Sequence, residues 1–247
     1  MAYTLITGST SDIGKDIAVK LSSNANLVLL GRDLSELEFI KSKCKFPENH
    51  LVFVFDFNDI IDFREVFTEF LLKNAINIEG LVHCAGMMKV MHMKNVDLQN
   101  TYQIFNVNVF SITEIIAVLL KKRVNNSKLK NIVFISSILA NFGSTGHHLY
   151  SSTKAALNGL MHSLAIELAP AIRVNSISLG AVATKMSKEL LSDKEVLVKL
   201  NNDYPLGIGT PKQISPFVNF LMSDDASWIT GQEFTLDGGR TINVNNK

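Results

Sequence analysis

The sequence predicts an α/β fold, a doubly wound parallel sheet of about seven strands with helices on both faces. Short apolar runs rich in valine, isoleucine and leucine recur along the chain, and such runs are typical of parallel strands buried on both faces. Amphipathic stretches with helical spacing lie between them, and this alternation indicates right-handed βαβ units. The expected strands are Tyr3–Ile6, Leu27–Leu30, Leu51–Phe55, Gly80–His83, Asn131–Ile135, Val174–Ile177 and Glu233–Leu236, and the expected helices are Ile13–Leu21, Ser35–Ser42, Phe63–Leu72, Val109–Leu120, Lys154–Leu168 and Pro211–Met222.

The chain is expected to form a single domain over residues 1–247. It has no internal repeat, no low-complexity tract and no linker rich in proline, glycine or serine. One segment, 181–204, breaks the alternation, because it follows a strand but is long and carries scattered leucine, valine and methionine. This pattern fits a helical lid over the carboxyl ends of the strands. An ordinary pair of surface helices is the alternative.

Composition limits the possible partners. The net charge of +1 argues against a nucleic-acid partner, which usually requires a strongly basic face. Cys44 and Cys84 form neither a CxxC pair nor a metal-ligand spacing, so we expect reduced thiols and no metal. No signal peptide precedes the first strand, and no run approaches about 18 apolar residues. We therefore expect a cytoplasmic protein without a membrane partner.

A turn that contains glycine, Thr7–Gly14, follows the first expected strand and leads into a helix. Gly8 allows the backbone to turn tightly and to approach a pyrophosphate, whose charge is favoured by the N–H groups of a helix N-terminus. The position of this turn after the first strand predicts a dinucleotide site. Asp12 is unfavourable beside a diphosphate, and we interpret it as a cap of the following helix.

The end of the second strand predicts which dinucleotide binds. NAD sites place an acidic residue there, and it holds the ribose 2′-hydroxyl. Gly31 occupies that place and Arg32 follows it, so the guanidinium favours a 2′-phosphate and we expect NADP(H) rather than NAD(H). Asp12 and Asp33 weaken this expectation, since either can offset the charge of Arg32. The alternative is that Arg32 only begins a solvated turn.

Tyr150 and Lys154 are spaced i, i+4 in an expected helical segment, which places them on one face. Tyrosine ordinarily titrates near about 10, and a neighbouring ammonium stabilises tyrosinate and lowers that pKa. Such a pair suits general acid/base work on an alcohol or a carbonyl. The motif is common by chance, so its context decides the interpretation.

That context resembles the short-chain dehydrogenase/reductase family over nearly the whole chain. The turn Thr7–Gly14 is similar to the family's TGxxxGxG motif, with Asp12 in place of the middle glycine. Ser137 lies thirteen residues before Tyr150, as the family's serine does, and Asn108 matches the family's helical asparagine. Further similar segments are His83–Gly86 (with His83 and Cys84 in place of two asparagines), Ile172–Ile177, Leu179–Thr184, Pro205–Pro211, Ile229–Gln232 and Asp237–Gly239. The loops most resemble those of 3-oxoacyl-carrier-protein reductases.

The resemblance implies a Rossmann fold and an NAD(P)-dependent oxidoreductase that acts on a ketone or a secondary alcohol. Ser137 and Tyr150 would polarise the reacting oxygen, and Tyr150 would transfer the proton. Lys154 would hold the nicotinamide ribose, and Asn108 would support a water chain. The family also implies a homo-oligomer, a tetramer or a dimer. The implied cofactor-binding residues are Gly8, Ser11, Ile13, Gly14, Arg32, Asp56, Phe57, Ala85, Gly86, Tyr150, Lys154, Val182 and Thr184.

Two alternative functions remain open. The substrate can be a free or nucleotide-linked sugar rather than a 3-oxoacyl thioester. Four methionines between residues 87 and 93 suit varied apolar shapes near the expected substrate mouth, although core packing is the simpler explanation for them. The second alternative is a cofactor-binding sensor without turnover, since a fold does not determine a function. Asp12, Cys84 and Leu179 are the departures from the family that allow it.

Overall fold

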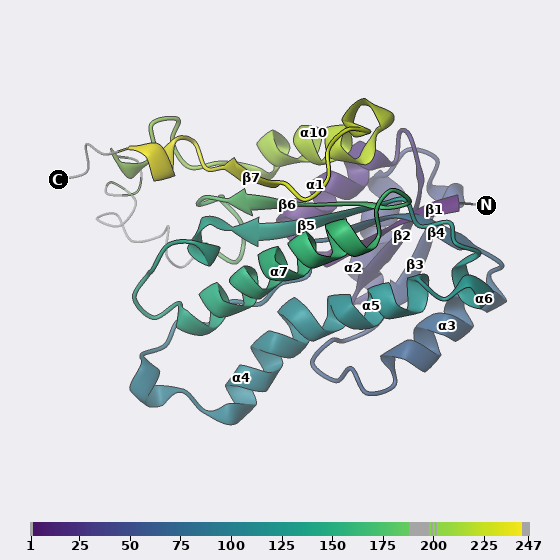
Figure 1. Cartoon of the computed structure of the whole chain (residues 1–247), viewed down its shortest axis with the longest axis horizontal. Coiled ribbons are helices and arrows are strands. Elements are labelled where there is room, and N and C mark those ends of the chain that lie inside the picture. The colour runs from purple at the N-terminus through teal and green to yellow at the C-terminus, as the bar shows by residue number, and fades with distance from the viewer. Residues whose placement is uncertain (1, 188–197, 199, 201, 244–247) are drawn as a thin grey trace.

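Seven parallel strands form one sheet in the order β3-β2-β1-β4-β5-β6-β7 (Figure 1). The structure, a computed structural model, describes residues 2–187, 198, 200 and 202–243. The predicted α/β class and the predicted number of strands are confirmed. The strands are β1 Ala2–Thr7, β2 Asn26–Gly31, β3 Leu51–Val54, β4 Asn77–His83, β5 Asn131–Ser137, β6 Arg173–Leu179 and β7 Glu233–Leu236.

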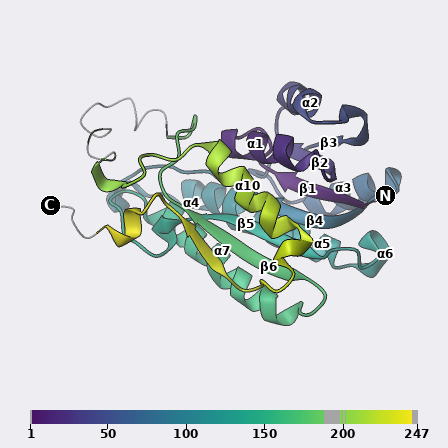
Figure 2. The ribbon, with the colours of Figure 1, turned by 90° about the horizontal axis from the view of Figure 1, so that it is seen from above.

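Helices cover both faces of the sheet (Figure 1). One face carries α1, α2 and α10, and the other carries α3, α5 and α7. The buried side chains form one cluster on each face, and each cluster contains residues from the three helices of that face. Figure 2 shows α10 lying across the strands beside α1. The helices are α1 Asp12–Leu21, α2 Leu34–Lys43, α3 Phe63–Lys73, α4 Leu98–Phe105, α5 Ser111–Leu119, α6 Lys122–Asn125, α7 His148–Glu167 and α10 Pro211–Met222. Short 3-10 turns cover Pro47–Asn49, Met93–Asn95, Ile138–Ala140, Asp224–Ala226 and Arg240–Ile242.

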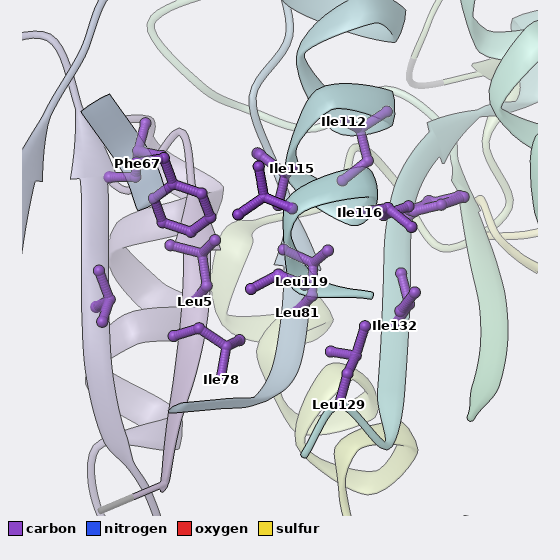
Figure 3. Packing of buried hydrophobic residues seen from close by; sticks show 14 of the residues in the cluster. Leu5, Phe67, Ile78, Leu81, Ile112, Ile115, Ile116, Leu119, Leu129 and Ile132 are labelled. Atoms are coloured by element: carbon purple, nitrogen blue, oxygen red, sulfur yellow. The ribbon is translucent and has the colours of Figure 1, made fainter. Parts of the chain in front are cut away.

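The core between the sheet and helices α3, α5 and α7 holds the strands in place. Leu5, Leu81 and Ile132 project from three neighbouring strands (Figure 3). They lie in the same cluster as Phe67 of α3 and Ile115 of α5, and all five side chains are 0% exposed. Full burial of each such side chain contributes about 1.5–3 kcal/mol. The strands whose carboxyl ends carry the site are therefore rigidly supported.

The long helical stretch Leu98–Leu119 is interrupted. A π-turn over Asn106–Phe110 joins α4 to α5, so the predicted single helix Val109–Leu120 is wrong at its start. Helix α4, in which only Ile104 is buried, was not among the helices expected from the sequence. By length and composition the stretch is apolar enough to cross a membrane, but half of its most apolar window is buried in the protein. It is a core helix, since α5 packs on α3.

The predicted lid at 181–204 lies largely outside the described residues, which omit 188–197, 199 and 201. Its first part follows β6 and is described. Val182 pairs with Gly209 through a parallel bridge, and the Ala183 N–H donates to the Gly209 carbonyl at 2.9 Å. This segment therefore begins beside the carboxyl ends of the strands.

Candidate active site

The strand order places the carboxyl ends of β1 and β4 side by side. In open α/β sheets, ligands bind at such a crossing point, where the connections leave for opposite faces. Gly8 follows β1 with a φ of +63°, and a Cβ at this position would lie 2.7 Å from both the Cα and the N of Ala85. Only glycine permits this approach. The predicted phosphate turn therefore lies directly against the residues that follow β4.

Ser11 caps α1 in the place where Asp12 was expected to do so. Ser11 has the extended backbone of an N-cap, and its hydroxyl oxygen accepts the Gly14 N–H at 3.0 Å. Asp12 is the first residue inside the helix, and its Oδ2 accepts the backbone N–H of Lys185 at 2.5 Å. The interpretation of Asp12 as the cap is wrong, because an N-cap lies outside the helix that it caps.

The end of β2 presents an unpaired cation. Arg32 is exposed and has no ion-pair partner among the residues that the structure describes. Asp33 is the N-cap of α2, where it accepts the Glu36 N–H at 3.1 Å and the Ser35 hydroxyl at 2.6 Å. These hydrogen bonds lower the pKa of Asp33. The Asp33 carboxylate is therefore engaged in the helix cap.

The two residues after β3 that were predicted to bind cofactor differ in exposure. Asp56 is exposed and accepts the Asn58 N–H at 3.0 Å. Phe57 is only 4% exposed, and its ring packs near those of Phe55 and Phe63 in the core.

A buried hydrogen-bond chain joins β1 to β4. The Ala85 N–H donates to Thr7 Oγ1 at 3.1 Å, and Thr7 Oγ1 lies 2.9 Å from His83 Nδ1. Thr7 and His83 are both 0% exposed.

Burial raises the pKa of the Cys84 thiol to about 12, which keeps it protonated and agrees with a packing role.

Asn108 lies in the π-turn and is fully buried. Its side chain accepts the Met87 N–H at 2.7 Å and donates to the Met87 carbonyl and to Thr153 Oγ1, both at 2.9 Å. The asparagine thus ties the segment after β4 to α7. A Cβ on Gly86 would lie 3.6 Å from Lys154 Nζ and 3.9 Å from Asn108 Oδ1.

Ser137, Tyr150 and Lys154 meet where β5 ends and α7 begins. Ser137 is the last residue of β5, and its hydroxyl is hydrogen-bonded to Tyr150. Lys154 lies one helical turn after Tyr150, and its ammonium is 5.6 Å from the centroid of the Tyr150 ring. Lys154 Nζ donates to the Ile135 carbonyl at 2.8 Å. Ser136 is separate from this group, since its hydroxyl donates to the Lys154 carbonyl at 3.4 Å.

Burial sets the pKa values of the pair. It raises the pKa of Tyr150 to about 12, against the opposing effect of the Ser137 hydrogen bond. It lowers the pKa of Lys154 to about 8, against the opposing effect of Cys84. The pKa of Tyr150 therefore moves upward, opposite to the expectation from the sequence. The reason is that burial raises the pKa of Tyr150 by more than the Ser137 hydrogen bond lowers it.

Comparison with known proteins identifies the family. A family model described as enoyl-(acyl carrier protein) reductase matches residues 8–241. The chain is 33% identical to a 3-oxoacyl-[acyl-carrier-protein] reductase of Buchnera aphidicola, over 95% of each chain. The chain belongs to the short-chain dehydrogenase/reductase family.

Other relatives of this family member are named as dehydrogenases of sugars or sugar acids. The chain is 31% identical to an L-rhamnose 1-dehydrogenase (NADP(+)) of Thermoplasma acidophilum, over 97% of this chain and 96% of that one. A solved short-chain dehydrogenase/reductase from Brucella melitensis, described as a glucose/ribitol dehydrogenase, superposes with a TM-score of 0.86 at 27% identity, over 96% of each chain. A gluconate 5-dehydrogenase from Burkholderia cenocepacia has the same fold, with a TM-score of 0.89 at 21% identity over 98% of this chain and 96% of that one.

Two residues of this short-chain dehydrogenase/reductase site were not singled out as functional from the sequence. Thr153 accepts from Asn108 and donates to the Tyr150 carbonyl at 2.7 Å. Thr7 joins Ala85 to His83. A threonine inside a helix and one at a strand end carry no periodic signal, so only the fold reveals them. Among residues 2–187, 198, 200 and 202–243 no cluster of histidine, cysteine, aspartate or glutamate could hold a metal ion.

Proposed function

We propose that this protein is an NADP(H)-dependent carbonyl reductase or secondary-alcohol dehydrogenase, with Tyr150 as the general acid/base. The observation that carries the proposal is the meeting of Ser137, Tyr150 and Lys154 at the carboxyl end of the sheet. Asn108 lies beside them, since its Oδ1 and Lys154 Nζ flank the same point above Gly86.

The raised pKa of Tyr150 fixes its protonation state. A phenol whose pKa is about 12 keeps its proton at neutral pH, so Tyr150 carries the proton that a carbonyl oxygen would receive in the reductive direction. Ser137 would donate a second hydrogen bond to the same oxygen. When bound, a nicotinamide dinucleotide supplies the hydride. Lys154, whose ammonium lies beside Gly86, would hold the cofactor ribose.

NADP(H) is the cofactor that the β2 end favours. The Arg32 guanidinium is exposed, and Gly31 offers no carboxylate to a ribose 2′-hydroxyl. The adjacent Asp33 caps α2 and forms no ion pair with Arg32 within the described part of the chain. The Thermoplasma relative carries NADP(+) in its name.

Substrates of two chemical classes follow from the relatives, a 3-oxoacyl thioester and a sugar. The 3-oxoacyl class has the stronger support, because several 3-oxoacyl-[acyl-carrier-protein] reductases match at 30–33% identity over most of the chain. The methionines at 87, 88 and 91 are half-buried and lie outside both core clusters, and Met93 is 71% exposed. Their side chains are therefore available to contact a ligand, and thioether side chains suit an apolar acyl chain.

A cytoplasmic homo-oligomer is the assembly that we propose. Ile166 of α7 is 83% exposed and Trp228, before β7, is 99% exposed. Large apolar side chains at such exposure suit contacts between subunits.

Tyr150→Phe tests the proposed function. NADPH oxidation is followed with a 3-oxoacyl thioester and, in reverse, NADP reduction with L-rhamnose. The variant should lose about 10²–10⁴-fold in kcat and should retain NADPH affinity. Tyr102→Phe, at an exposed position on α4, is the matched control and should behave as wild type. Full activity in Tyr150→Phe would contradict the assignment, and NADPH binding without turnover of any substrate would favour the sensor.

A further inference from the structure

A single carboxylate connects two segments that are far apart in the sequence. Asp12 Oδ2 accepts the backbone N–H of Lys185 at 2.5 Å. Asp12 is the first residue of α1, and Lys185 belongs to the segment Val182–Ser187 that follows β6. The family's motif has a glycine at the position of Asp12, so a glycine there could not make this contact.

The segment Val182–Ser187 has its own internal hydrogen bonds. The Ser187 hydroxyl donates to the Val182 carbonyl at 2.6 Å and accepts the Thr184 N–H at 3.0 Å. The first end of the segment is fixed by Gly209, which pairs with Val182 and accepts the Ala183 N–H. The contact with Asp12 holds the other end. Asp12 therefore decides how this compact turn lies against the glycine turn.

The charge of Asp12 acts at the same place. Asp12 is the first residue of α1, where the helix dipole and free N–H groups favour an anion. A dinucleotide pyrophosphate is attracted to this helix end for the same reason. The carboxylate and the pyrophosphate are therefore neighbours of like charge, and their repulsion weakens cofactor binding.

We propose that Asp12 is a positioning residue with two separable effects. Its hydrogen bond to Lys185 holds the segment Val182–Ser187 over the site, and its charge lowers the affinity for the dinucleotide. The second effect rests on the proposed function, whereas the first does not. The dinucleotide consequently binds less tightly than it would with an uncharged residue at this position.

Two substitutions separate the hydrogen bond from the charge. Asp12→Asn retains an acceptor oxygen for the Lys185 N–H but removes the charge. Asp12→Gly removes both and restores the family's residue. Glu65→Gln, at an exposed position of α3 away from the site, is the control for loss of one negative charge.

The first measurement is tryptic cleavage of the full chain without nucleotide, with the products weighed by mass spectrometry. Cleavage after Lys185 should be several-fold faster in Asp12→Gly than in wild type, because the segment is released. Asp12→Asn should be cleaved at the wild-type rate. Equal rates for Asp12→Gly and wild type would overturn the positioning effect, whatever the cofactor is.

The second measurement is the dissociation constant of NADPH at low and high salt. Asp12→Asn should bind NADPH about tenfold more tightly than wild type at low salt, and salt should narrow this difference. Its kcat should stay near the wild-type value, whereas Asp12→Gly should lose kcat while it also binds NADPH tightly. Unchanged NADPH affinity in Asp12→Asn would overturn the charge effect. If wild type and both variants bind neither NADPH nor NADH, the proposed function fails while the cleavage result still stands.

Discussion

Thr7 and His83 share a fully buried hydrogen bond at the crossing point of the sheet, with 2.9 Å between Oγ1 and Nδ1. Thr7 Oγ1 also accepts the Ala85 N–H. When the Thr7 hydroxyl donates its own proton to His83 Nδ1, the proton of the neutral ring lies on Nε2. Burial and the charge of Lys154 lower the pKa of His83 to about 3, although the Asn108 backbone opposes them. His83 is therefore a neutral link between the cofactor side and the catalytic side of the site.

Substitution of His83 should reduce stability in proportion to the hydrogen bonds lost. His83→Leu leaves the Thr7 hydroxyl without its buried partner, which costs about 1–3 kcal/mol. His83→Asn keeps an acceptor near the place of Nδ1 and should cost less. Urea unfolding at pH 7 measures both, and a His83→Leu protein as stable as His83→Asn would contradict the role of the Thr7 bond.

The pH dependence of stability gives a separate test of His83. Its folded pKa lies below the unfolded value of about 6.5, so the unfolded chain binds the proton more readily. Wild type should therefore lose stability as pH falls from about 6.5 toward 3. His83→Asn lacks this contribution, and the difference between the two unfolding free energies should change with pH only in that window. A constant difference would show that the ring titrates normally.

Lys154 should affect stability at alkaline pH. Its folded pKa of about 8 lies below the ordinary lysine value, so the protonated side chain opposes folding below pH 8. This cost disappears as pH rises from 8 through the unfolded pKa, and each pKa unit corresponds to about 1.4 kcal/mol. Wild type should therefore gain stability relative to Lys154→Met between pH 8 and pH 10. Above this window the raised pKa of Tyr150 begins to reduce stability. Parallel curves for wild type and Lys154→Met would contradict the lowered pKa.

Local signals explain how much of the fold was predictable. Helix α10, Pro211–Met222, agrees with its prediction residue for residue, because proline at its first position and a capping box of Thr210 and Gln213 mark its start. The strands agree within a few residues, since burial on both faces leaves continuous apolar runs. The proximity of Tyr150 and Lys154 in α7 was also predictable, because one helical turn separates them.

Contacts between distant segments were not predictable from the sequence. The bond from Asp12 to Lys185 depends on where the segment after β6 returns to the glycine turn. The π-turn at Asn108 depends on tertiary contacts with Met87 and Thr153. The pKa shift of Tyr150 depends on burial, which outweighs the local i, i+4 spacing.

Gly8 and Gly207 form a matched pair for testing the close approach at the crossing point. Both have positive φ, +63° and +73°, so alanine is strained at either position. A Cβ on Gly8 would meet the Ala85 backbone at 2.7 Å, whereas one on Gly207 would meet nothing within 4 Å. Gly207→Ala should therefore cost only about 1–2 kcal/mol, and Gly8→Ala should cost clearly more and weaken NADPH binding. Equal unfolding midpoints in urea would show that the backbone strain alone governs both sites.

Arg32 should determine which cofactor is preferred. A guanidinium that binds a 2′-phosphate through charged hydrogen bonds contributes about 1.5–3 kcal/mol, so Arg32→Ala should weaken NADPH binding by about tenfold to a hundredfold. NADH lacks the 2′-phosphate, and its affinity should stay within about twofold of wild type. Dissociation constants from fluorescence titration measure this, with Arg123→Ala on α6 as a control for loss of one exposed arginine. If Arg32→Ala weakens NADPH and NADH equally, the arginine supports the shape of the β2 end instead. In that case the NADP(H) preference must be withdrawn, because no other feature of the described chain favours the 2′-phosphate so directly.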